Sequence, residues 1–151
     1  MIAAHTDSEV IVSDSDTRAF SLFTLAPTGA GATSAWTGTY ASVNPVTIND
    51  SNSVYTNTAS VTEQFTLTSL PTGVFSIQAV KVTARAELTA GSTPTNLSVG
   101  VYSHTTLAAG TSVAQTTAWQ ENESLLAVNP VTSAAWTQAE ISALQVALTS
   151  A

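Results

Sequence analysis

Hydrophobic and polar residues alternate one by one along the middle of the chain. In the segment VKVTARAEL (80–88), Val80, Val82, Ala84, Ala86 and Leu88 alternate with Lys81, Thr83, Arg85 and Glu87. Such a period of two predicts a β-strand with one buried side and one side facing water. A helix would scatter the same apolar residues around its axis.

Similar strand-like runs occur at 9–12, 19–25, 36–43, 61–70, 96–103, 113–119 and 124–128, with turn residues between many of them. The glycine-containing segment PTGAGATSA (27–35) reads as a loop. Strands at this spacing predict an all-β, antiparallel β-sandwich, jelly-roll-like in type. Residues 1–35 read as an N-terminal arm with the first strands, and 36–151 as the sandwich, most simply within one domain.

One short helical turn is expected near residues 138–143. Thr137 and Glu140 have the spacing of a capping box, in which each side chain bonds the backbone of the other residue. Trp136 and Ile141 stand where a hydrophobic staple would pack across that turn. Alternation resumes at 144–149, so we expect a final strand that closes the sheet, with Trp136 anchoring the corner in the core.

The composition favours strands and argues against polyanionic partners. Charged residues make up 9% of the chain, and polarity comes mainly from 26 Thr and 19 Ser. Threonine is β-branched and suits the exposed side of a sheet. The net charge is −7, with Lys81, Arg18 and Arg85 as the basic residues, so we expect no binding to nucleic acid or to anionic membranes.

The sequence also bears on the cellular compartment. There is no cysteine, which excludes disulfides and thiolate-bound metals. No apolar run reaches the ~20 residues of a membrane span, and the first residues lack the features of a signal peptide. We therefore expect a protein made in the cytoplasm.

Residues capable of catalysis or metal binding do not form a recognisable pattern. His5 and His104 lack the spacing of metal ligands. His5 is expected in a mobile N-terminus, and His104 reads as a surface-loop histidine. The acidic segment 7–16 lacks the glycine and terminal glutamate of a calcium loop, and Glu121 and Glu123 have no matched second acid. No G-x-S-x-G or phosphate-binding loop occurs. The expectation is a protein that is not an enzyme, with no catalytic residues, no metal and no cofactor.

Aromatic residues offer the clearest sign of a binding surface. Trp36, Tyr55 and Trp119 are candidate interaction residues, because exposed aromatic rings on a sandwich can stack against sugars. Packing in the core is the alternative for each of them. A carbohydrate-binding module for host-surface glycans is therefore one open hypothesis.

Three segments together resemble a group of small virion proteins of tailed bacteriophages. They are W-x3-Y with NP and D-x4-Y (36–55), FTLTSLPTG-x3-IQAVKVTARAEL (65–88) and NPVTSAAWTQAEISALQVAL (129–148). The resemblance covers roughly residues 36–148, and the last segment is the most specific. The chain departs from it at Ala147, where glycine is expected, and at Asn129, where aspartate is common.

The resemblance implies a structural role on the phage particle. The expected function is that of a capsid decoration (cement) protein or a tail- or neck-associated protein, located in the virion. Its expected partners are major capsid or tail subunits and further copies of itself. A low-charge, hydroxyl-rich surface agrees with such a role, because it binds through area and hydrogen bonds.

Overall fold

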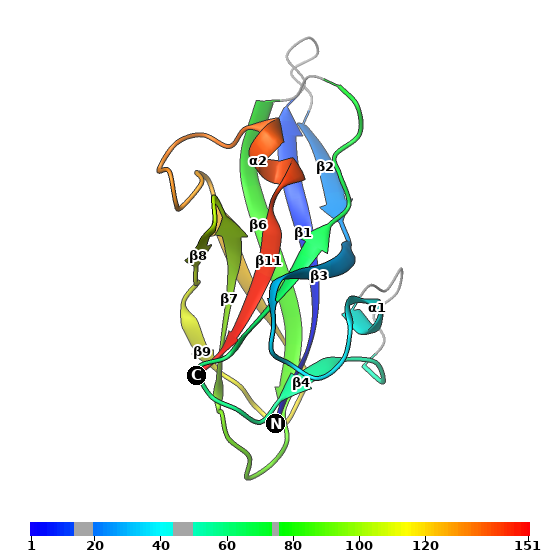
Figure 1. Cartoon of the computed structure of the whole chain (residues 1–151), viewed down its shortest axis with the longest axis vertical. Coiled ribbons are helices and arrows are strands. Elements are labelled where there is room, and N and C mark those ends of the chain that lie inside the picture. The colour runs from blue at the N-terminus through cyan, green and yellow to red at the C-terminus, as the bar shows by residue number, and fades with distance from the viewer. Residues whose placement is uncertain (14–19, 44–49, 74–75) are drawn as a thin grey trace.

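Two antiparallel β-sheets pack against each other in the computed structural model, which describes residues 1–13, 20–43, 50–73 and 76–151 (Figure 1). Sheet A contains β1 (Ile2–Ser13), β2 (Phe20–Leu25), β4 (Val54–Thr56), β6 (Ser76–Leu88) and β10 (Gln120–Leu126). Sheet B contains β3 (Pro27–Ser34), β5 (Thr62–Leu67), β7 (Asn96–Ser103), β8 (Thr106–Ala108), β9 (Ser112–Ala114) and β11 (Gln145–Ser150). The predicted all-β sandwich is confirmed.

The strand order places the longest strands at the centre of sheet A. Its order is β10-β6-β1-β2, with β4 also paired to β1. The order in sheet B is β3-β5-β11-β7-β8, with β9 also paired to β7. Both chain ends lie at the same end of the molecule (Figure 1).

Alternation along β6 sorts its side chains as the sequence predicted. Val80, Val82, Ala84 and Ala86 are buried between the sheets, and the residues between them are partly exposed. In sheet B, Val146 and Leu148 of β11 face this core as well. The buried side of β6 thus follows directly from a period of two.

The N-terminal residues lie in the middle of sheet A, which corrects the expectation of a mobile terminus at His5. β1 pairs with β6 from Ile2 to Ser13, and on its other side with β4 and then β2. Ile2 and Ala4 are fully buried and Thr6 is nearly so. Alanine and threonine at inward positions blur the apolar alternation, so only 9–12 read as a strand.

The glycine-containing segment 27–35 is mostly a strand, so its prediction as a loop was wrong. β3 is an edge strand that pairs with β5 through two register shifts. At Gly31 an added Cβ would overlap the side chains of Gln64 and Gln145, which shows how closely the backbones approach. Glycine here permits the close approach of β3 to β5 and β11 of the same sheet, rather than a turn.

Residues 36–43 do not form the predicted strand. Thr37 makes one isolated bridge to Tyr55, and the short helix α1 (Tyr40–Val43) follows. Gly38 between them has a φ of +115°, which a strand does not allow. The acidic turn at 14–16 and the loop residues 44–49 lie outside the described residues.

The C-terminal turn confirms its prediction. Helix α2 (Gln138–Ser142) starts at Thr137 with a complete capping box. Trp136 and Ile141 are both buried in the core. β11 then runs between β5 and β7, so it completes sheet B from inside rather than at an edge.

Candidate functional site

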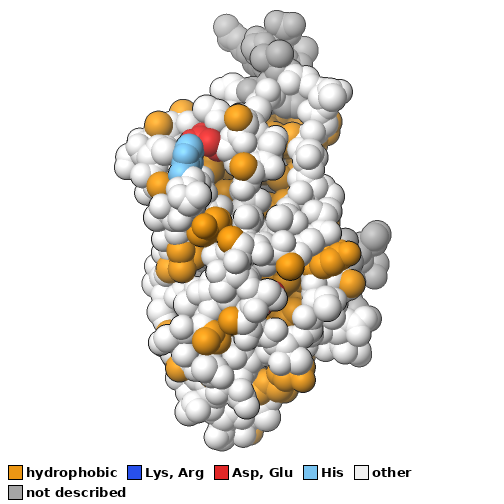
Figure 2. Space-filling model, viewed as in Figure 1, with side chains coloured by type: hydrophobic (Ala, Val, Ile, Leu, Met, Phe, Trp, Pro, Cys, Tyr) orange, Lys and Arg blue, Asp and Glu red, His pale blue; other side chains and the backbone are white. Residues whose placement is uncertain are grey.

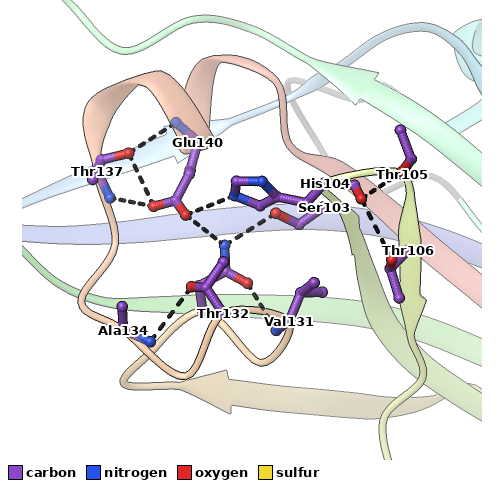
Figure 3. Close-up of polar contacts among 10 residues, drawn as sticks. Ser103, His104, Thr105, Thr106, Val131, Thr132, Ala134, Thr137 and Glu140 are labelled. Atoms are coloured by element: carbon purple, nitrogen blue, oxygen red, sulfur yellow. Dashed lines mark hydrogen bonds and ion pairs between the residues drawn. The ribbon is translucent and has the colours of Figure 1, made fainter.

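Glu140 is the centre of a polar junction at the end of the molecule that carries α2 (Figures 1 and 3). Its Oε2 accepts hydrogen bonds from the backbone N of Thr137 at 2.7 Å and from Thr137 Oγ1 at 2.9 Å. Its Oε1 lies 2.8 Å from His104 Nε2 and accepts from Asn129 Nδ2 at 3.0 Å. One carboxylate therefore ties α2 to the end of β7 and to the loop after β10.

These contacts lower the pKa of Glu140 from its ordinary 4.5 to about 2. The hydrogen bond with His104 is the largest cause, and the bonds from Thr137 and Asn129 act in the same direction. Each contact favours the charged carboxylate. Glu140 is therefore ionised in all ordinary buffers and serves as an acceptor, not as an acid.

Asn129 completes the junction from the side of the loop. It is fully buried, and its Nδ2 also donates to Ser103 Oγ at 3.1 Å. Its Oδ1 accepts from the backbone N of Val131 at 2.9 Å. An aspartate, which the phage resemblance would favour here, has no amide to donate and would place a second acid beside Glu140.

His104 reaches Glu140 from a strained turn. His104 and Thr105 form the two-residue connection between β7 and β8, with φ values of 48° and 60°. Tight hairpins of this kind usually use Asn and Gly. Ser103, His104, Ala139, Glu140 and Ala143 line a small open pocket of about 210 Å³. The surface position predicted for His104 is confirmed, but its acidic partner was not foreseen.

A histidine paired with a carboxylate can activate a nucleophile, and covalent catalysis needs that nucleophile within hydrogen-bond reach of the imidazole. Ser103 is buried, and its Oγ accepts a hydrogen bond from Asn129 Nδ2 at 3.1 Å. Within residues 1–13, 20–43, 50–73 and 76–151, no group of three His, Asp or Glu side chains is placed to hold a metal. The contacts of Glu140 therefore fit a structural role, in which they hold α2 against the end of β7 and the loop after β10.

The predicted aromatic residues are separated by the structure. Trp36 is only 6% exposed, and its Nε1 donates to the Val61 carbonyl at 3.3 Å, so it packs in the core and is not a surface platform. Tyr55 is 39% exposed, and Trp119 is partly exposed with the Arg85 guanidinium 5.9 Å from its ring centre. Tyr55 and Trp119 thus remain as surface aromatics, and Trp136 is buried as predicted.

The outer side of sheet B carries no charged strand residue in the described part of the chain. Its strands contain one charged residue, Glu63, which is 2% exposed and points into the sandwich. In the face seen in Figure 2, acidic and histidine side chains stand together near α2, and the rest of the described surface shows no charged side chain. Threonine, serine and glutamine supply the polarity there, as in the Thr62–Thr149 pair with Oγ1 atoms 3.0 Å apart.

Glu63 is a second acid whose environment the sequence did not reveal. Its two carboxyl oxygens accept from Ser34 Oγ and from the backbone N of Trp36, both at 2.9 Å. It therefore holds the chain where it leaves β3. A polar residue at an inward position of a strand was the signal available in the sequence.

Glu121 and Glu123, weighed as an acid pair, are exposed positions on β10. Glu123 lies 3.9 Å from Lys81 across the strand pair.

No helix in the described residues has the length and apolar character of a membrane span. No protein-family model matches the chain, and no curated protein or solved structure matches it. The likeness to phage virion proteins stays an expectation from the sequence.

Proposed function

We propose that the protein is a non-enzymatic structural component of a bacteriophage particle. It acts as a capsid decoration protein or a tail- or neck-associated protein and binds neighbouring virion subunits. The proposal rests on the sequence resemblance for the kind of particle, and on one structural observation for the mode of binding. That observation is the uncharged outer side of sheet B.

An uncharged side of a sheet suits permanent contact between proteins. Charged side chains hold water strongly and are depleted from the cores of interfaces. Thr62 and Thr149 are partly exposed and uncharged, and each hydroxyl of their pair can make a further hydrogen bond. The strands give them a stiff support. Binding through such a surface depends little on salt, since screening acts on charges.

Location in the particle is the first test. Virions of the phage whose genome encodes the chain are purified, and an antibody to this protein is imaged on them by immunogold electron microscopy. Regular labelling of the capsid, neck or tail is expected. Purified virions without the protein, in both labelling and mass spectrometry, would refute the proposal.

A matched pair of variants tests the binding side. Thr149→Lys puts a charge on the outer side of sheet B, and Thr83→Lys puts the same charge on the outer side of sheet A; both threonines are partly exposed. We expect Thr149→Lys to weaken co-sedimentation with virions stripped of the protein by tenfold or more, about 1.4 kcal/mol. Thr83→Lys should bind like the wild type. Equal loss in both variants would exclude sheet B as the binding side.

A further inference from the structure

Tyr55, which is 39% exposed, and the partly exposed Trp119 lie on the outer side of sheet A, near the N-terminal end of β1. Tyr55 of β4 pairs with Ala3 of β1, and Ala3 pairs with Glu87 of β6. Trp119 directly precedes β10, whose Gln120 pairs with Ala86 next to Glu87. We name the surface from Tyr55 across Ala3, Glu87 and Arg85 to Trp119 the aromatic strip.

The strip crosses four neighbouring strands. Adjacent strands lie about 4.8 Å apart, so three spacings separate its two aromatic ends by about 14 Å. Ala3 in its middle is small and only 6% exposed, so the side chains of its neighbours form the surface there. The strip thus has an aromatic residue at each end and polar side chains between them.

Arg85 fixes one end of the strip. Its Nε and Nη2 donate to the two carboxyl oxygens of Asp50, each at 3.0 Å. The same guanidinium lies 5.9 Å from the centre of the Trp119 ring. Two-point pairing with a carboxylate and contact with an aromatic face together restrict the orientation of Arg85 and of the indole. Preformed aromatic surfaces bind with less loss of entropy.

We propose that the aromatic strip binds a neutral oligosaccharide several sugar units long. Sugar rings present apolar C–H faces, which stack on Tyr and Trp, and hydroxyls, which bond to charged and polar side chains. An anionic sugar is disfavoured, because Glu87 and Glu121 border the strip and the whole chain carries −7. This activity lies on the sheet opposite the proposed virion contact, and neither proposal depends on the other.

Tryptophan fluorescence gives a direct test. Trp36 and Trp136 are 6% and 4% exposed, so Trp119 is the indole in contact with solvent and with added sugar. The probes are neutral hexaoses of glucose (α- and β-linked), of N-acetylglucosamine, of mannose and of galactose, with hexagalacturonate as the anionic comparison. At least one neutral hexaose should produce a saturable change, and hexagalacturonate should produce none.

Calorimetry on variants then locates the site. Trp119→Ala and Tyr55→Ala should each weaken binding by roughly tenfold, since each removes one stacking surface. Tyr55→Phe keeps the ring and should bind within about threefold of the wild type. Tyr40→Ala is the matched control, because Tyr40 is equally exposed at 39% but lies on α1. Its affinity should not change.

Three results would overturn the proposal. The first is no response to any neutral hexaose at millimolar concentration. The second is binding that survives the double variant Tyr55→Ala/Trp119→Ala while that variant keeps the wild-type circular dichroism spectrum. The third is an equal loss in Tyr40→Ala. The virion labelling above is independent of all three.

Discussion

The two sheets of this sandwich share one core but differ on their outer sides. The strands of sheet A contain five charged residues whose side chains the structure describes: Lys81, Arg85, Glu87, Glu121 and Glu123. Those of sheet B contain only Glu63, which is buried. Sheet A therefore resembles an ordinary solvated surface, whereas sheet B is polar almost entirely through hydroxyl and amide groups.

The difference affects how each sheet is stabilised. Charged groups on sheet A meet in exposed pairs such as Lys81–Glu123, where solvent weakens the attraction. In sheet B, polar side chains bond the backbone of crossing segments. Gln64 Oε1 accepts from Thr33 N at 3.1 Å, and Gln145 Oε1 accepts from Ala32 N at 2.7 Å. Substitutions in sheet B should consequently cost more stability than equivalent ones in sheet A.

Substitution of Glu63, the buried acid of sheet B, should give the largest loss of stability. Glu63→Ala leaves Ser34 Oγ and the Trp36 amide without their acceptor, and we expect a loss of about 3 kcal/mol in the free energy of unfolding. Glu123→Ala on sheet A removes the same side chain from an exposed pair and should cost less than about 0.5 kcal/mol. Urea titration followed by circular dichroism measures both. Similar losses would contradict the distinction between the sheets.

The next largest loss of stability should come from Gly31, where the backbones of β3 and β5 approach closely. Gly31→Ala brings a methyl group against Gln145 Oε1 and within 2.8 Å of the Gln64 backbone, so we expect a loss of about 2 kcal/mol. Gly29→Ala is the control on the same strand. There the new methyl meets only Thr66 Oγ1, at 2.9 Å, and a side chain can turn away. A loss in Gly29→Ala as large as in Gly31→Ala would point to a general glycine effect.

Acid should weaken the junction at the end of the sandwich. The pKa of Glu140 is about 2 in the folded chain and 4.5 ordinarily, so its stabilising effect is complete above pH 4.5. It declines as the pH falls from 4.5 towards 2, by on the order of 1–2 kcal/mol once solvent screening is allowed for. Glu140→Gln cannot titrate, so its free energy of unfolding should fall less over this range.

This acid effect is read from urea midpoints of both proteins across the same pH series. Glu123→Gln is the control, because that carboxylate is exposed, and it should lose stability with pH as the wild type does. Parallel curves for wild type and Glu140→Gln would show that Glu140 does not carry the acid dependence.

The smallest expected change is a gain. Thr105 is β-branched and has a φ of 60°, a conformation that glycine adopts without strain. Thr105→Gly should therefore raise the free energy of unfolding by about 0.5–1 kcal/mol. Thr106→Gly, at the first position of β8, should lower it instead. Thermal melts suffice, and a destabilised Thr105→Gly protein would show that the bond from Thr105 Oγ1 to the His104 carbonyl matters more than backbone strain.

Local patterns predicted the parts of the fold whose geometry is local. The alternation along β6 sorted its buried positions, and the Thr137–Glu140 spacing located α2. Prediction failed at β1, because its inward residues Ala4 and Thr6 are not large apolar residues and so do not show the alternation. It also failed at β3, because glycines of this kind are typical of a loop. In both places the neighbouring strands, not the segment itself, impose the extended form.

The candidate sites show the same division. Aromatic residues were visible in the sequence, but only the packing buried Trp36 and left Tyr55 and Trp119 at the surface. Glu140 was recognised as a helix cap, while its contact with His104 joins residues 36 positions apart. No spacing rule connects residues at such separations.

The sequence by itself determined that this protein is a sandwich of β-sheets with few charges, because side chains on a strand alternate between two sides whatever the strand pairs with. It also determined the turn at Thr137, since a capping box closes within four residues. The tertiary structure decided which strands are neighbours, that the charges gather on one sheet, and that Glu63 and Asn129 are buried with partners. Those outcomes depend on contacts between distant segments, which form only when the two sheets pack together.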